Sequence, residues 1–170
     1  MGQSKYYHYF VEGEDEEKLI QVLKTDLRLI VPGKVQKFNV VEQKLTRLRL
    51  MSLKEGTTVV LVFDTDTGKV DILKENIAFL KKEGIVYDVL CITQVKNMED
   101  ELKRSCNVKQ IKDLTGSRSN KDFKHDFIRD GAICQKLVRR GFDFNKFWNM
   151  TADNEFSCIS NDANKIKIRA

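Results

Sequence analysis

Apolar residues along this chain gather in short runs that charged or glycine-containing segments separate. Four of these runs, at residues 6–11, 35–41, 58–63 and 85–92, are rich in β-branched and aromatic side chains and predict strands. The run at 58–63 is apolar on both faces, which is typical of a central strand in a sheet that is covered on both sides.

Segments with helical spacing alternate with these strands. After residue 14 an apolar face recurs every three to four positions, and it is formed by Leu19, Ile20, Leu23, Leu27 and Ile30. A basic helical stretch is predicted over residues 43–53, and a further helix begins at Val70 and ends at Gly84. This alternation with short connections predicts an α/β fold, here a four-stranded, mainly parallel sheet flanked by helices.

The chain changes character after Asn97, where the strand signals end. The helices predicted beyond it cover residues 100–106, 120–129 and 131–140. Residues 101–150 carry 12 basic and 6 acidic side chains, whereas residues 1–100 carry 15 basic and 16 acidic ones. We expect a core at residues 1–100 and a basic helical extension at residues 101–170, packed on the same domain. A basic flank of this kind is typical of a phosphate-binding surface, and also of an ordinary solvated lysine-rich surface.

Composition narrows the class of protein. The 170 residues suffice for one ordinary domain, and the 41% hydrophobic and 32% charged residues suit a globular fold. The four cysteines are widely spaced in the sequence (Cys91, Cys106, Cys134 and Cys158), and the chain has only two histidines. We therefore expect reduced thiols and neither structural zinc nor disulfides. No apolar stretch has the length of a membrane span or the form of a signal peptide, so we expect a cytoplasmic protein without membrane contact.

Acidic residues follow three of the predicted strands. Glu12 comes after the first run, Asp64 and Asp66 come after the third, and Glu99 lies a few residues past the fourth. Functional groups in open α/β sheets collect outside the carboxyl ends of the strands. Two aspartates at i and i+2 suit Mg²⁺, and Glu16, four residues after Glu12, can converge with it on a second ion. A turn with helix-capping side chains is the simpler explanation of either acidic pattern taken alone.

Taken together, these motifs resemble the TOPRIM domain of topoisomerases, bacterial primases and several nucleases. The resemblance rests on the segment Phe10 to Gly13 (FVEG) and, later in the chain, on Val60 to Asp66 (VLVFDTD). A glutamate after the first strand and an Asp-x-Asp after the third are the marks of that family, in which they bind Mg²⁺ or Mn²⁺. The resemblance covers residues 6–100.

Within that family the chain resembles the nuclease branch, with the overcoming-lysogenization-defect nucleases and the small RloB-like proteins of phage defence. Glu16 and Glu99 stand where this branch has further acids. Its Ser-x-Glu motif corresponds here to residues 97–99 (NME), in which the serine is absent. The branch also has a lysine, for which Lys121 or Lys124 is the candidate.

The resemblance implies a divalent-metal-dependent nuclease that cleaves phosphodiester bonds of DNA or RNA by a two-metal scheme. The residues it implies as ligands of Mg²⁺ or Mn²⁺ are Glu12, Glu16, Asp64, Asp66 and Glu99. Among these, catalysis would fall to Glu12, Asp64 and Asp66, with Glu12 as a ligand or as an acid or base. The residues implied to hold the nucleic-acid backbone are Arg118, Lys121 and Lys124.

Small nucleases of this branch often act beside a separately encoded ATPase, so the resemblance implies such a partner in addition to nucleic acid.

Two other interpretations of the same motifs stay open. Haloacid-dehalogenase-like phosphatases also begin with an Asp-x-Asp, in which the first Asp is the nucleophile, although that strand usually comes first in them. A TOPRIM-like scaffold could instead bind nucleic acid or a protein partner without cutting.

Overall fold

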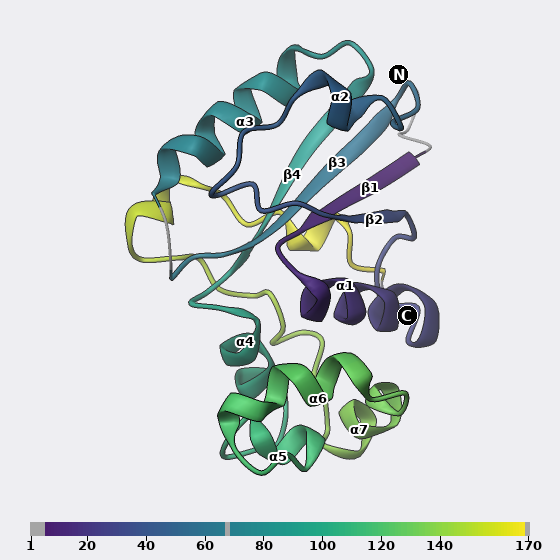
Figure 1. Ribbon diagram of the computed structural model, residues 1–170, viewed down its shortest axis with the longest axis vertical. Helices are drawn as coiled ribbons and strands as arrows, with labels where there is room; N and C mark the ends of the chain where they lie inside the picture. Colours follow the sequence, from purple (N-terminus) through teal and green to yellow (C-terminus); the bar gives the residue numbers. More distant parts are fainter. Residues whose placement is uncertain (1–5, 67–68, 169–170) are drawn as a thin grey trace.

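The centre of the fold is one four-stranded sheet, seen in a computed structural model that describes residues 6–66 and 69–168. All neighbouring strands are parallel, in the order β2-β1-β3-β4 (Figure 1). The strands are Tyr6–Val11 (β1), Lys34–Lys37 (β2), Thr57–Asp64 (β3) and Val86–Gln94 (β4). The predicted α/β class is confirmed, with every strand pair parallel.

Helices connect the strands and continue after the last of them. They are α1 (Glu14–Gln21), α2 (Arg47–Leu50), α3 (Val70–Lys82), α4 (Met98–Ser105), α5 (Lys112–Thr115), α6 (Phe123–Arg129) and α7 (Ile133–Arg139). Shorter turns of other helical types lie at Val22–Asp26, Asn120–Asp122, Glu155–Cys158 and Ala163–Lys165. No helix among the described residues is long and apolar enough to cross a membrane.

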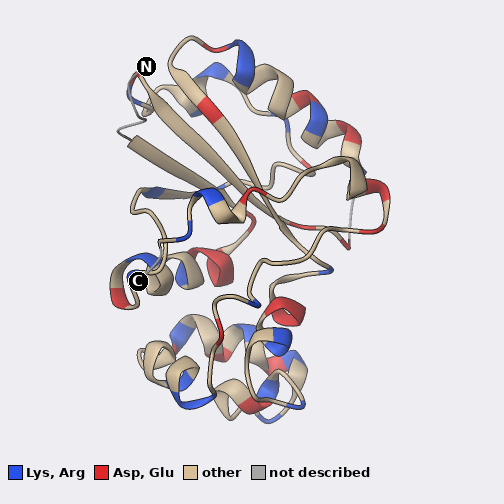
Figure 2. Cartoon of the chain, turned by 180° about the vertical axis from the view of Figure 1, so that it is seen from behind, with Lys and Arg blue, Asp and Glu red and all other residues tan. Residues whose placement is uncertain are grey.

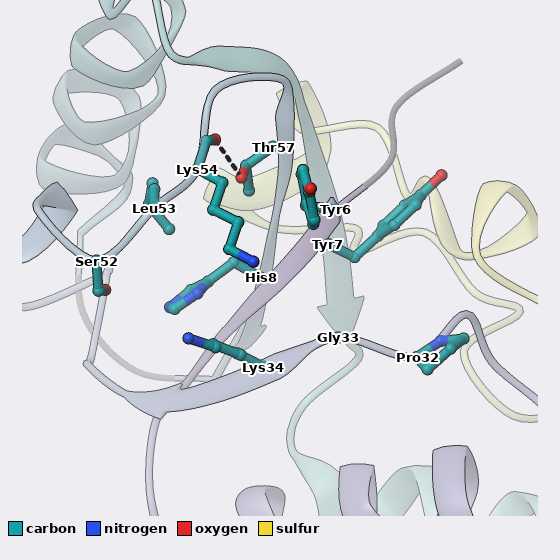
Figure 3. A pocket seen from close by; sticks show the side chains of 10 residues that line it. All are labelled: Tyr6, Tyr7, His8, Pro32, Gly33, Lys34, Ser52, Leu53, Lys54 and Thr57. Atoms are coloured by element: carbon teal, nitrogen blue, oxygen red, sulfur yellow. Dashed lines mark hydrogen bonds between the residues drawn. The ribbon is translucent and has the colours of Figure 1, made fainter.

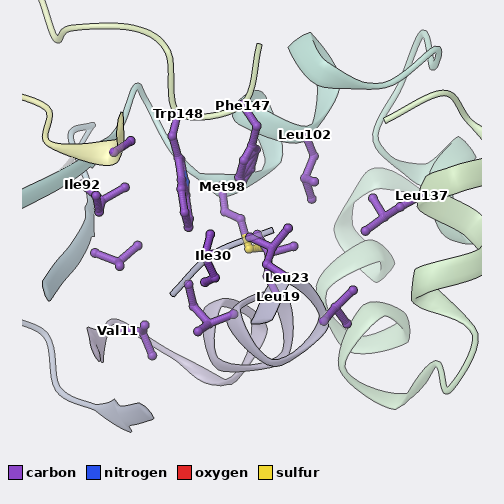
Figure 4. Close-up of a cluster of buried hydrophobic side chains, with 14 of the residues drawn as sticks. Val11, Leu19, Leu23, Ile30, Ile92, Met98, Leu102, Leu137, Phe147 and Trp148 are labelled. Carbon is purple, nitrogen blue, oxygen red and sulfur yellow. The ribbon is translucent and has the colours of Figure 1, made fainter. Parts of the chain in front are cut away.

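The two sheet faces are buried by different parts of the chain. Alternate residues of β3 divide between them: Val59, Leu61 and Phe63 pack in one cluster with Leu73 and Leu80 of α3. Val60 and Val62 pack in the other cluster, which Figure 4 shows, with α1 and the helical extension. The extension contributes Leu102, Leu137, Phe147 and Trp148 among others, next to Met98 at the start of α4. The sheet and the extension therefore share one hydrophobic core.

The C-terminal tail returns to the sheet after the lower helices (Figure 1). There Asp162 binds the outer edge of β4: its N–H donates to the Cys91 carbonyl over 2.7 Å, and the Cys91 N–H donates to its Oδ2 over 2.9 Å. Because an unpaired strand edge invites association with other chains, the tail protects this edge.

Two predicted elements are shorter than their sequence patterns indicate. The second strand ends at Lys37 and not at residue 41, and the basic stretch at 43–53 is helical only over α2. The cause is Asn76, a buried residue of α3 that binds the backbone of the intervening loop. Its side chain donates to the carbonyls of Val40 and Gln43 and accepts from the Leu45 N–H, each over 2.8 Å. Because these backbone groups bind Asn76, they do not pair within a strand or a helix.

The first helix also ends before the predicted apolar face does. After α1 the chain makes a π-helical turn over Val22–Asp26, and Arg28 then adopts the left-handed conformation, with φ of 54°. A left-handed residue ends a helix. Ile30 is still buried, but it pairs with Lys167 of the tail in an isolated β-bridge.

We expect Gly33→Ala to destabilise the fold. A Cβ at Gly33 would lie 2.8 Å from the Tyr7 carbonyl carbon on the neighbouring strand β1, so β2 would have to move. Overpacking of this kind costs about 1–3 kcal/mol, and each kcal/mol lowers the Tm of a chain of this size by roughly 2–4 °C. Gly84→Ala is the control, because its Cβ would meet no atom within 4 Å. Equal melting temperatures for both variants would contradict the expectation.

Candidate metal centre

Parallel pairing of the two central strands brings Glu12 and Asp64 together. Phe10 of β1 is in register with Leu61 of β3, so both strands end at the same edge of the sheet. The Asp64 backbone N–H donates to Oε1 of Glu12 over 3.2 Å. The convergence expected from the strand-end acids is therefore present for these two residues.

Glu16 completes a group of three carboxylates. It lies in the first turn of α1, where its Oε2 accepts from the Gly13 N–H over 3.2 Å. Ligand oxygens of Glu12, Glu16 and Asp64 all lie within 4.8 Å of one another, so one cation can touch all three. An all-oxygen donor set suits a hard divalent cation. The three residues form a site that can hold a metal ion.

Burial disfavours the charged form of each of these carboxyl groups. Loss of hydration raises the pKa of Asp64 to about 9, and the charge of Glu12 adds to the effect. Loss of hydration also raises the pKa of Glu16 to about 10, aided by a hydrogen bond with Asp15. The pKa of Glu12 is raised by the same desolvation, which outweighs its bonds to Asp64. Protons or a cation must therefore compensate the charges near neutral pH.

Asp15, in the first turn of α1, also belongs to this neighbourhood. The residue is 1% exposed, and its Oδ1 has no hydrogen-bond partner in the described part of the chain. A Cβ on Gly13 would lie 3.2 Å from this oxygen and 3.5 Å from Oε2 of Glu16. The glycine after Glu12 therefore leaves room for two carboxylates. A buried orphan acceptor among acids fits a site built for a cation.

Asp66 and Glu99 border the three-carboxylate group without joining it. Asp66 is exposed, and its Oδ2 accepts from the side chain of Asn97 over 3.1 Å. Its charge still contributes to the raised pKa of Asp64. Burial raises the pKa of Glu99, with a further contribution from the charge of Asp15. Glu99 thus lies on the Asp15 side of the site, where α1 and α4 bring acidic first turns near each other (Figure 2).

Of the two candidate lysines, the structure brings Lys124 to the site. Its Nζ lies 3.5 Å from Oδ2 of Asp15, and its side chain is 59% exposed. Burial opposes a charge on Lys124, but the surrounding acids, Asp15, Glu16 and Glu99, raise its pKa above the ordinary value. Lys124 is the one basic side chain that pairs with a buried acid of this group among the described residues.

The other predicted nucleic-acid contacts lie on the surface nearby. Arg118 and Lys121 are exposed, in the segment that leads into α6, and neither forms an ion pair with a described residue. Figure 2 shows Lys and Arg distributed over the lower helices that carry them. They stay candidates for phosphate contact.

Gln94 supports Asp64, a role that no pattern in the sequence indicates. The fully buried Gln94, at the end of β4, donates its Nε2 to Oδ1 of Asp64 over 2.7 Å. Its Oε1 accepts from Nε1 of Trp148 over 3.3 Å. The indole thus fixes the orientation of the amide, and the amide fixes the carboxylate.

Comparisons with protein-family models, with curated proteins and with solved structures find no match for this chain. The resemblance to the TOPRIM domain therefore rests on the motifs, with which the parallel sheet is consistent. Membership of that family stays a prediction.

We expect Asp64→Asn and Glu16→Gln each to remove the stabilisation that Mn²⁺ or Mg²⁺ gives the parent. Asn and Gln keep the shape of the side chain but lose the charge that holds a hard cation. Near neutral pH and without metal both variants should melt at a higher temperature than the parent, because Asn and Gln are neutral without the proton that Asp64 and Glu16 must take up on folding. Melting curves with and without metal test this. Glu55→Gln, an exposed acid before the start of β3, is the control and should respond to metal as the parent does.

The metal-free protein should lose stability as the pH rises. Between the ordinary Asp64 pKa of 3.8 and its folded pKa of about 9, the folded state keeps a proton that the unfolded state has lost. Stability falls with pH wherever the folded state binds more protons. Urea unfolding in chelator from acid to alkaline pH should show this fall. The slope should be shallower for Asp64→Asn, and an unchanged slope would refute the role of this carboxyl.

Proposed function

We propose that this protein is a divalent-metal-dependent phosphodiesterase that cleaves nucleic acid. The observation that carries the proposal is the meeting of Glu12, Glu16 and Asp64 at the carboxyl end of the two central strands. Their oxygen donors suit Mg²⁺ or Mn²⁺. Bound cations of this kind supply water of lowered pKa and compensate charge on a reacting phosphodiester.

The chain's own side chains would orient this chemistry. Gln94 and the Asp64 N–H hold the carboxylates of Asp64 and Glu12 in fixed directions. Asp66 and Glu99 flank the group and offer oxygens for a second cation. Lys124, charged and more than half exposed beside Asp15, is placed to donate to a phosphate oxygen.

A polymeric substrate is favoured by the surface next to the site. Residues 101–150 carry twice as many basic as acidic side chains, and the helices that bear them lie below α1 (Figure 1). Exposed Arg118 and Lys121 can bind backbone phosphates on either side of a cleaved bond, in DNA or RNA. A separately encoded ATPase partner and a role in phage defence stay predictions from the resemblance.

We expect Asp64→Asn and Glu16→Gln to lower phosphodiester cleavage by orders of magnitude. Loss of the cation removes both the water of lowered pKa and the compensation of charge on the reacting phosphodiester. The measurement uses labelled single- and double-stranded DNA and RNA with Mg²⁺, Mn²⁺ or chelator. Glu55→Gln should cleave like the parent. Arg118→Glu with Lys121→Glu should weaken binding of all sequences alike and flatten its salt dependence, without changing the metal response.

Each other outcome points to a different function. Full cleavage by both carboxylate variants would overturn the site. A parent that binds nucleic acid and cleaves none of the substrates would favour the binding module. Hydrolysis of small phosphomonoesters with a phosphorylated Asp64 would favour the phosphatase.

A further inference from the structure

A cavity of about 320 Å³ lies at the end of the sheet opposite to the carboxylates. It is lined by residues at the starts of β1, β2 and β3 and in the loop before β3 (Figure 3). Tyr6 of β1 pairs there with Thr57 of β3. Glu12 lies six residues further along β1, which at about 3.3 Å per residue is roughly 20 Å away. The cavity is therefore separate from the candidate metal centre.

Positively charged groups gather on one side of this cavity. Lys34 comes from β2 and Lys54 from the loop, and Figure 3 shows their amino groups directed toward the His8 ring. Burial lowers the pKa of His8, the bond to Gln36 opposes this, and the charge of Lys34 lowers it further, so the lysine lies close to the imidazole. No lining residue is acidic, and none of the ion pairs between described residues includes either lysine.

In the described part of the chain, no carboxylate forms an ion pair with either lysine. Lys54 is held by a ring instead: its Nζ lies 4.8 Å from the centroid of the Tyr6 ring, a distance at which cation–π attraction acts. The His8 ring is fixed by Phe10, 4.8 Å away between centroids, and by the bond between Nε2 and Gln36. Two ammonium groups near one buried imidazole offer a position for an anion, most simply a phosphate.

The remaining walls combine apolar side chains with the polar residues Ser52 and Thr57. Tyr7 and Pro32 line the cavity on the side away from the lysines, as Figure 3 shows, and Leu53 lines it from the loop. Pockets for small ligands have volumes of about 300–1,000 Å³ and combine apolar walls with a few polar groups. The volume here lies at the lower end of that range, which suits a ligand with one planar ring system and one anionic group.

We propose that this cavity binds a nucleoside monophosphate, with its phosphate between Lys34 and Lys54 and its base against the Tyr6 ring. The site does not depend on the proposed phosphodiesterase activity, because no residue is shared with the carboxylate group. Recognition would come from two charge-assisted hydrogen bonds and from ring contact at one end of the sheet.

Calorimetric titration and amide NMR spectra of the full chain test the proposal, with chelator present so that the carboxylates hold no metal. The probes are AMP, GMP, CMP and UMP, together with adenosine, ribose 5-phosphate and inorganic phosphate. At least one mononucleotide should bind saturably and shift amide signals of Tyr6, Tyr7, His8, Lys34 and Lys54. Adenosine, ribose 5-phosphate and phosphate should each bind about tenfold more weakly or worse, because each lacks one of the two contacts.

Variants assign the binding to this cavity. Lys34→Ala and Lys54→Ala should each weaken it about tenfold or more, the effect of one charge-assisted hydrogen bond. Lys74→Ala, at an exposed lysine of α3, should bind as the parent does. No saturable binding of any mononucleotide would overturn the proposal. So would an equal loss in Lys74→Ala, shifts confined to the carboxylate end, or phosphate binding as tightly as the best mononucleotide.

Discussion

The constraint on which this structure depends is the confinement of carboxylates in a partly buried position. Three of them place oxygens within 4.8 Å of one another, and a fourth, Asp15, keeps a buried oxygen for which the described residues offer no hydrogen-bond partner. Such a group is unfavourable unless protons, donors or a cation compensate it. The chain provides donors at each acid: the Asp64 N–H for Glu12, the Gly13 N–H for Glu16 and the Gln94 amide for Asp64.

These donors belong to the elements that form the sheet edge. Gly13 is the N-cap of α1, Asp64 ends β3 and Gln94 ends β4, so the strand pairing sets the geometry of the site. The helical extension contributes as well. Trp148 binds Gln94, and the buried Glu101 accepts from the backbone N–H groups of Val95 and Trp148 over 2.8 and 3.0 Å. The extension therefore covers the core and also positions Asp64, through the bond from Trp148 to Gln94 and the bond from Gln94 to Asp64.

The sequence predicted those parts of the fold and site that follow from local pattern and from parallel pairing. Apolar runs located β1, β3 and β4 to within about two residues, because buried parallel strands need continuous apolar side chains. Glu12 and Asp64 were expected to converge because the carboxyl ends of parallel neighbours lie at one edge. Both expectations agree with the structure.

The remainder depends on contacts between distant segments. Asn76, which lies on α3, binds the loop backbone that would otherwise extend β2 and α2. No property of residues 40–45 themselves indicates this contact. The packing of α6 against α1 decides that Lys124, and not Lys121, meets Asp15. Asp15 stands in the acidic segment that follows Glu12. Acids at the start of a helix also suit the positive end of its dipole, so this pattern alone does not assign Asp15 to the site.

The two ends of the sheet differ in chemistry because each gathers side chains of one sign. Carboxylates collect after β1 and β3, whereas Lys34 and Lys54 line the cavity at the starts of the strands. The ends are separated by roughly 20 Å of buried strand, about twice the Debye length at physiological ionic strength. Opposite charges at that distance compensate each other little in solution, since salt screens exposed groups. Each end is therefore compensated on its own, by protons or a cation at the carboxylates and, in the site proposed above, by an anion at the lysines.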